Sequence, residues 1–269
     1  MNSDSRVILF TCLASFSDES DVWTSLETYE QALNLLKTCT DSERQSDLLR
    51  ALLEERIKPL FVRSKSPAIT QEGRKAIDSL PLNDSLHSDL DIKVKPWKYR
   101  TVYIITVIQW ILTQLDEKLL EINWPLLVPP LLALIDDSST QYKAKGCDFL
   151  RIFLKKCPPP LLGRTGLGEV FDNALMPCLI YFPSLTEETE ALQVLAAAYP
   201  VVIDLALVRF PDAKQQGARI TTLDKILRNG ILKGYAHAGE HVKVAEVLVN
   251  HMITLIREMG TASVPRLKV

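Results

Sequence analysis

The string HAGEH, from His237 to His241, has the residue types and spacing of a zinc peptidase motif. On one helix, the two histidines would lie one turn apart and could share a zinc ion, while Glu240 could act as the catalytic base. Gly239, however, indicates a turn between two helices, and the next histidine, His251, stands in no obvious register with the pair. A zinc-dependent hydrolase built on this string is therefore a minor alternative.

A second string, GRTGLG, from Gly163 to Gly168, is rich in glycine like the loops that bind phosphate groups. Such loops present backbone N–H groups at the start of a helix to an anion. Here the string follows a proline run instead of a strand, and it lacks the Gly-Lys-Ser/Thr ending of a nucleotide-binding loop. We interpret it as a flexible loop between repeats, and we predict no cofactor.

Basic and aromatic residues alternate in KVKPWKYR, which contains Trp97, Lys98 and Arg100. Such a mixture can stack on single-stranded nucleic acid and neutralise it. The formal net charge of the chain is −2, so the positive field of a general nucleic-acid binder is missing. We predict no nucleic-acid partner. The three residues either begin a helix beside a partly buried tryptophan or anchor a protein partner.

Two aspartates and a lysine in DDSSTQYKAKG resemble an acid–base pair, but no nucleophile or set of metal ligands stands near them. In a HEAT unit, an aspartate in the turn caps the second helix, a basic side chain reaches an aspartate, and a small residue lets the helices approach. The matching residues are Asp136, Asp137, Tyr142, Lys143 and Gly146. The segment therefore predicts a structural repeat corner without catalytic or metal-binding residues.

Almost every periodic segment fits an amphipathic helix, and no segment shows the clean alternation of a strand. Helical hairpins start near Trp124, Gly168 and Ala213, at intervals of 44 and 45 residues. HEAT and armadillo units repeat at about 40–47 residues. We predict an all-α fold, an α-solenoid of HEAT/armadillo-like helical hairpins. A compact helical bundle is the competing architecture, but it does not predict a constant interval.

Residues 124–135 are expected to form a short helix of this series. Asn123 can cap it, and Pro125 suits its first turn. Pro129 and Pro130 lie inside the segment, so we expect a kink or a late start.

Composition supports a large globular fold. The chain has 269 residues, of which 47% are hydrophobic, enough for a continuous core. Five cysteines without a CxxC pair are typical of a reducing compartment. We predict N-terminal helical hairpins over residues 1–61, a polar linker or mobile loop over 62–95, and the solenoid over 96–269.

The most apolar run, TVYIITVIQWILTQL, spans residues 101–115. It is about five residues short of the roughly 20 that cross a bilayer, and it carries two glutamines. We predict a buried helix here and no membrane partner.

Four segments together resemble the Tti-two family, that of the second Tel-two-interacting protein. They are KPWKYRTVYIITVIQWIL, WPLLVPPLLALIDDSSTQYKAKGCDFL, RTGLGEVFDNALMPCLIYFPSLTEETEALQVLAAAYP and LVNHMITLIREMGTASVPRLK. The blocks TGLGEVFDNAL and YFPSLTEETEAL are the most specific, because general HEAT patterns do not require them. The resemblance covers about residue 95 to the end of the sequence.

The resemblance implies a non-enzymatic subunit of the TTT complex, with the Tel-two protein and the first Tel-two-interacting protein as partners. That complex works with the Hsp-ninety system to mature the phosphatidylinositol-3-kinase-related kinases (PIKKs), which act in TOR signalling and the DNA damage response. We accordingly expect a cytoplasmic and nuclear protein. An importin-like cargo adaptor is a further alternative, but no acidic or Asn/Trp ladder repeats at the unit interval.

The chain departs from the family pattern after SVPRLKV, which resembles the start of a further repeat. Without a neighbour, the last helix would leave an apolar face open. Either the sequence is truncated, which we favour, or this end docks a partner.

Overall fold

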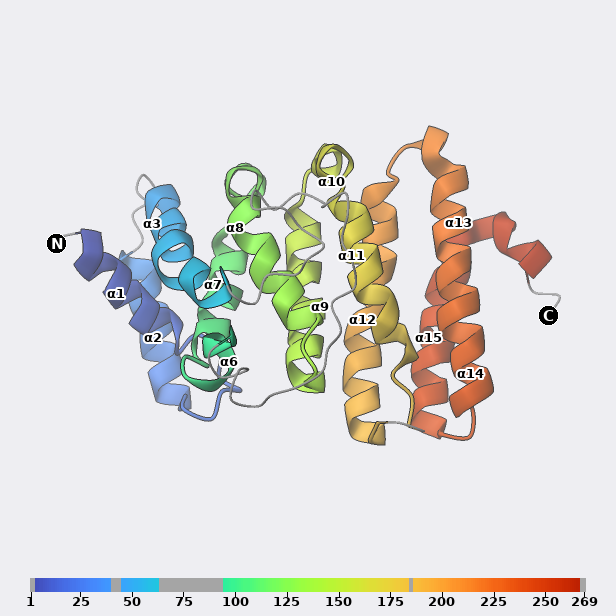
Figure 1. Ribbon diagram of the computed structural model, residues 1–269, viewed down its shortest axis with the longest axis horizontal. Helices are drawn as coiled ribbons and strands as arrows, with labels where there is room; N and C mark the ends of the chain where they lie inside the picture. Colours follow the sequence, from blue (N-terminus) through green and yellow to red (C-terminus); the bar gives the residue numbers. More distant parts are fainter. Residues whose placement is uncertain (1–2, 40–44, 63–93, 184–185, 267–269) are drawn as a thin grey trace. The chain divides into compact units, whose positions relative to one another are not determined.

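The structure is a computed structural model that describes residues 3–39, 45–62, 94–183 and 186–266. Within these ranges every regular element is a helix, and no strand occurs (Figure 1). The predicted all-α class of packed helices, as in an α-solenoid, is confirmed. Most of the predicted linker, residues 63–93, lies outside the described residues.

The chain forms two compact units, Met1–Ala133 and Leu134–Val269. The division falls inside the last turns of helix α8 (Glu117–Ile135). The domain limits predicted at residues 61 and 95 stay a prediction.

Unit 1 is built from short helices packed around aromatic and aliphatic side chains. Its helices are α1 (Ser3–Ala14), α2 (Leu26–Cys39), α3 (Gln45–Ala51), the π-helical η2 (Leu52–Ile57), α4 (Lys58–Phe61), α6 (Pro96–Tyr99), α7 (Ile104–Gln114) and most of α8. Helix α7 is largely buried, as predicted for the apolar run. The largest fully buried side chains in this unit are Phe10, Leu49, Leu52, Leu53, Ile57, Phe61, Trp97, Ile104 and Ile108.

Helix α8 corrects the prediction of a helix capped by Asn123. The helix begins at Glu117 and continues through Pro125, Pro129 and Pro130. Asn123 lies inside it, and its side-chain amide donates a hydrogen bond to the Leu119 carbonyl at 2.9 Å. The side chain therefore bonds backwards within a continuous helix instead of starting a new one.

Unit 2 consists of longer helices layered on α12. Its helices are α9 (Thr140–Lys156), α10 (Pro159–Thr165), α11 (Leu167–Leu175), η4 (Met176–Ile180), α12 (Glu188–Arg209), η5 (Ala213–Gln215), α13 (Gln216–Ile226), the π-helical η6 (Leu227–Leu232), α14 (Lys233–Ala238), α15 (Val242–Met259) and η7 (Gly260–Arg266). Helix α9 carries Tyr142, Lys143 and Gly146 of the predicted repeat corner.

Helix α12 packs against α9 and against α15. An ion pair between Arg151 and Asp204, at 2.8 Å, ties it to α9. On α15, the His251 ring stacks on Tyr199, with ring centroids 5.1 Å apart. The central helix of this unit is therefore held by neighbours from both directions along the chain.

Two helices, α8 and α12, are long and apolar enough to cross a membrane by length and composition alone. Buried residues make up 67% of the apolar window in α8 and 61% of that in α12. Core helices of soluble folds pass the same test, so this finding is weak evidence for a membrane span.

Candidate protein-interaction site

The predicted repeat corner joins α8 to α9 within unit 2. Asp137 is only 1% exposed, and its carboxylate accepts a hydrogen bond from the backbone N–H of Ser139 at 2.8 Å. Ser139 is the N-cap residue of α9, and its carbonyl accepts the N–H of Lys143. Asp136, by contrast, is exposed. Asp137 is thus the aspartate that holds the turn before the second helix.

Lys143 lies one turn into α9 and is only 6% exposed. Its ammonium group donates a hydrogen bond to the carbonyl of Ile135, the last residue of α8. It also lies 5.5 Å from the centre of the Tyr181 ring. The last carbonyls of a helix lack intrahelical partners and carry partial negative charge. The bond to Ile135 therefore makes Lys143 a cap for the end of α8.

Gly146 sits where α9 crosses the end of α8. A Cβ atom built on it would lie 2.7 Å from the backbone nitrogen of Ile135 and 2.9 Å from Cβ of Leu134. Carbon atoms in proteins essentially never approach a backbone nitrogen so closely, so a residue without a side chain is required. Tyr142, the remaining corner residue, is half-buried.

Two free thiols, those of Cys147 and Cys178, meet beneath this corner. The hydrogen bond between the thiols and their burial raise the pKa of Cys147 well above its usual range. No sequence motif predicted this contact, because the two cysteines come from separate helices. The thiols are inaccessible, so they act as small apolar side chains rather than as exposed nucleophiles.

The predicted partner anchor at residues 97–100 is divided between the interior and the surface of unit 1. Trp97 is fully buried and stacks on Phe61, with ring centroids 5.2 Å apart and planes 10° from parallel. Arg100 is exposed, and the Lys98 ammonium lies over the Tyr99 ring. A partner could therefore reach the basic side chains and Tyr99, whereas the indole ring belongs to the core.

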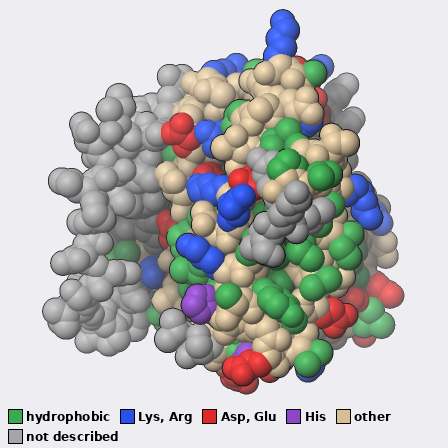
Figure 2. All heavy atoms as spheres, turned by 90° about the vertical axis from the view of Figure 1, so that its right-hand side faces the viewer, with side chains coloured by type: hydrophobic (Ala, Val, Ile, Leu, Met, Phe, Trp, Pro, Cys, Tyr) green, Lys and Arg blue, Asp and Glu red, His purple; other side chains and the backbone are tan. Residues whose placement is uncertain are grey.

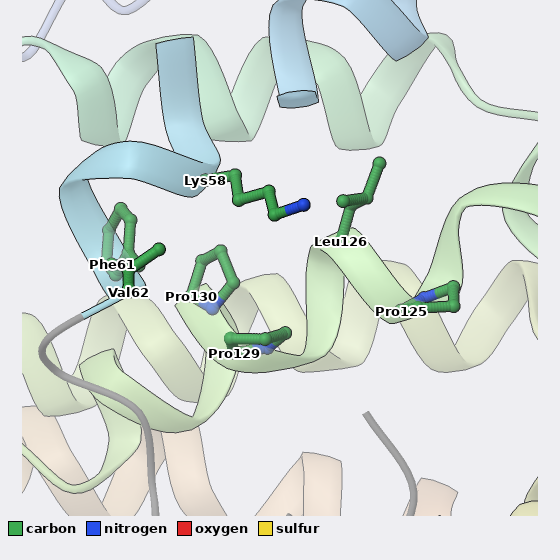
Figure 3. A pocket seen from close by; sticks show the side chains of 7 residues that line it. All are labelled: Lys58, Phe61, Val62, Pro125, Leu126, Pro129 and Pro130. Carbon is green, nitrogen blue, oxygen red and sulfur yellow. The ribbon is translucent and has the colours of Figure 1, made fainter. Parts of the chain in front are cut away.

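A pocket of about 490 Å³ opens beside Phe61 between α4 and α8. Figure 3 shows that Lys58 points from α4 toward Leu126, while Pro129 and Pro130 line the pocket from α8. Because Pro129 and Pro130 have no N–H group, the carbonyls four residues earlier receive no helical hydrogen bond from them. The seven lining residues are Lys58, Phe61, Val62, Pro125, Leu126, Pro129 and Pro130.

The HAGEH string spans the turn between α14 and α15 instead of lying on one helix. His237 is in the last turn of α14, and His241 is the N-cap residue of α15. One ring nitrogen of His241 lies 3.4 Å from the Glu188 carboxylate. The turn predicted at Gly239 is confirmed, so the one-helix zinc geometry is not present. No group of three or more potential metal ligands occurs in the described part of the chain.

The GRTGLG string is a tight junction between α10 and α11, which corrects the prediction of a flexible loop. Gly166 has φ 72°, the left-handed conformation that ends α10. A Cβ atom on Gly168 would lie 3.0 Å from Cδ of Arg209, so this glycine allows α11 to approach α12. Both glycines therefore serve helix packing.

Helix α15 carries exposed apolar residues that no sequence motif singled out. Val242, Val249 and Ile253 are 78%, 40% and 48% exposed. Figure 2 shows hydrophobic side chains gathered over the face formed by the C-terminal helices. We call the exposed side of α15 that carries these three residues the α15 outer face. Its signal in the sequence is the spacing of seven and four residues.

A sequence model of the Tti2 family matches residues 9–269. The resemblance recognised from about residue 95 onward thus extends over nearly the whole chain, including unit 1. No solved structure matches the chain.

Proposed function

Because the chain belongs to the Tti2 family, we propose that it is a non-enzymatic scaffold subunit of a TTT-like co-chaperone complex. The match over residues 9–269 is the observation that carries the proposal. Its task would be to hold partner proteins on its helical surface.

The contacts of the chemically suggestive residues support a scaffold role. Asp137 holds a turn, and Lys143 caps a helix end. His241 begins a helix beside Glu188. Each of these side chains therefore has a structural task at a helix corner, which is how a repeat protein uses polar residues between its apolar helices.

The partners we propose are the first Tel-two-interacting protein and the Tel-two protein, acting with the Hsp-ninety system on kinases of the PIKK family. The exposed side chains of Tyr99 and Arg100 in unit 1 offer a surface for such contacts. We also propose a cytoplasmic and nuclear location, because the chain would contact these kinases there.

Co-purification tests the proposal directly. The chain, tagged and co-expressed with the first Tel-two-interacting protein, should elute with it as a stoichiometric complex in size-exclusion chromatography. In cells, depletion of the chain should lower the steady-state level of PIKK proteins without lowering their messenger RNA. A folded chain that ignores this partner at micromolar concentration would contradict the proposal, and binding of basic targeting peptides would favour a cargo adaptor.

A further inference from the structure

The α15 outer face lies beside the side of α15 that enters the core. The buried side carries Val244, Leu248 and Leu255. The exposed apolar residues Val242, Val249 and Ile253 recur at spacings that place them on one side of a helix. A surface helix usually buries its apolar side and exposes a polar one. On α15 the apolar side is wider than the part that enters the core, so its edge stays exposed.

Two opposite charges lie along one edge of this apolar stripe. Glu246 and Arg257 are both exposed, and neither makes an ion pair within the described residues. Their positions on the helix are close in angle, so they lie along the same edge of the stripe. Eleven residues of helix separate them by about 16 Å, at 1.5 Å per residue, so they cannot pair with each other in one chain.

We propose that the α15 outer face pairs with the α15 outer face of a second copy of this chain, with the two helices antiparallel. A two-fold axis beside residues 251–252 would place Glu246 opposite Arg257 of the second copy, and Val249 opposite Ile253. The two-fold rotation keeps the charged edges of both helices on the same side of the helix pair. Both ion pairs therefore form on the same side of the apolar contact. The face is therefore complementary to itself in charge and in apolar character, which is what an isologous dimer requires.

The area of the face determines how tight this dimer is. Stable protein interfaces bury about 1,200–2,000 Å² in total, and one pair of helices offers less. We therefore expect a reversible dimer that forms with rising concentration. This inference goes beyond the proposed function, because partner binding in the pull-down and self-association can succeed or fail independently.

Sedimentation equilibrium of the full chain, over a range from micromolar to hundreds of micromolar, measures the association. The wild type should show a monomer–dimer equilibrium. Ile253→Glu should abolish it, because a carboxylate would lie at the apolar centre of the contact. Ile180→Glu is the matched control, because Ile180 is 58% exposed on η4, outside α15, and its substitution should leave the dimer intact.

Charge reversal tests the antiparallel register. Glu246→Arg and Arg257→Glu should each weaken the dimer by about tenfold, since each change replaces two attractive pairs with two repulsive ones. The double variant, E246R with R257E, should restore wild-type association. Circular dichroism must show that every variant is folded. A chain that stays monomeric throughout the range, or a double variant weaker than either single variant, would overturn the proposal.

Discussion

The α8–α9 corner and the α14–α15 corner both carry residues that resemble a catalytic set, but they lie at different depths. At the first corner, Asp137 and Lys143 are 1% and 6% exposed. At the second, the side chains of Glu240 and His241 are 87% and 32% exposed. A buried polar group must find a partner inside the protein, whereas an exposed one is satisfied by water. The same kinds of residue should therefore matter greatly for stability at one corner and little at the other.

The largest effect is expected for Gly146→Leu at the buried corner. Its Cβ atom would already lie 2.7 Å from the Ile135 backbone nitrogen. A backbone atom inside a helix cannot move away as the end of a flexible side chain can. We expect a loss of about 3 kcal/mol in the free energy of unfolding, at the upper end of overpacking effects. Chemical denaturation followed by circular dichroism measures it.

The control for this variant is Gly163→Leu on α10. No atom lies within 4 Å of the Cβ position at Gly163, so this change should be neutral or slightly stabilising. Equal denaturation midpoints for the two variants would show that the helix crossing at Gly146 is not close.

Lys143→Met should also destabilise the buried corner, by about 1–3 kcal/mol. Methionine keeps most of the side-chain length but leaves the Ile135 carbonyl without its donor, which is the cost of an unsatisfied buried acceptor. Lys155→Met, at an exposed site on the same helix, should change the unfolding free energy by less than about 0.5 kcal/mol. If the two lysine variants were equally stable, the buried hydrogen bond would contribute nothing measurable.

Asp137→Ala is expected to cost about 0.5–1.5 kcal/mol, the usual contribution of one side-chain hydrogen bond to stability. Its neighbour Asp136 is exposed, so Asp136→Ala should cost less. Thermal unfolding of the two variants in parallel distinguishes the aspartates, and a reversed order would assign the turn to Asp136.

The corner shows how far the sequence predicts the fold and where it fails. Apolar periodicity predicted the all-α class, because a helix buries one side at a fixed spacing. In the structure, Asp137 lies in the turn between α8 and α9, and Gly146 lies where the two helices cross. The sequence did not predict that Lys143 would bond to the Ile135 carbonyl. Every residue has a backbone carbonyl, so the residue types do not show which one accepts a hydrogen bond.

Other features also depend on tertiary packing. Asn123 looked like a cap, but α8 begins earlier, where the Asp116 carboxylate accepts the N–H of Leu119 at 2.8 Å. The helix then continues through three prolines. Trp97 was predicted either to lie partly buried at a helix start or to anchor a partner, and it is fully buried against Phe61, a residue far away in the sequence. The residues of the α15 outer face recur at helical spacing in the sequence, but only the structure shows that they are exposed.

A third histidine, His251, differs from the corner histidines because it packs against Tyr199. Burial, with a smaller contribution from Arg151, lowers the pKa of His251 below its usual value of 6.5. The unfolded chain then binds this proton more tightly, so stability present above pH 6.5 is lost as the pH falls below that value. His251→Gln should reduce the loss of unfolding free energy between pH 7 and pH 5. A loss as steep as in the wild type would contradict the assignment.

The smallest effect is expected at the exposed corner. His241→Ala removes the contact with Glu188, whose side chain is 40% exposed, and water can replace it. We expect a change below about 1 kcal/mol in unfolding free energy, as for other surface ion pairs. The double variant His237→Ala/His241→Ala should leave the zinc content of the purified protein unchanged, because the two rings come from different helices. A loss of stoichiometric zinc, measured by elemental analysis, would mean that the two corners differ in chemistry as well as in depth.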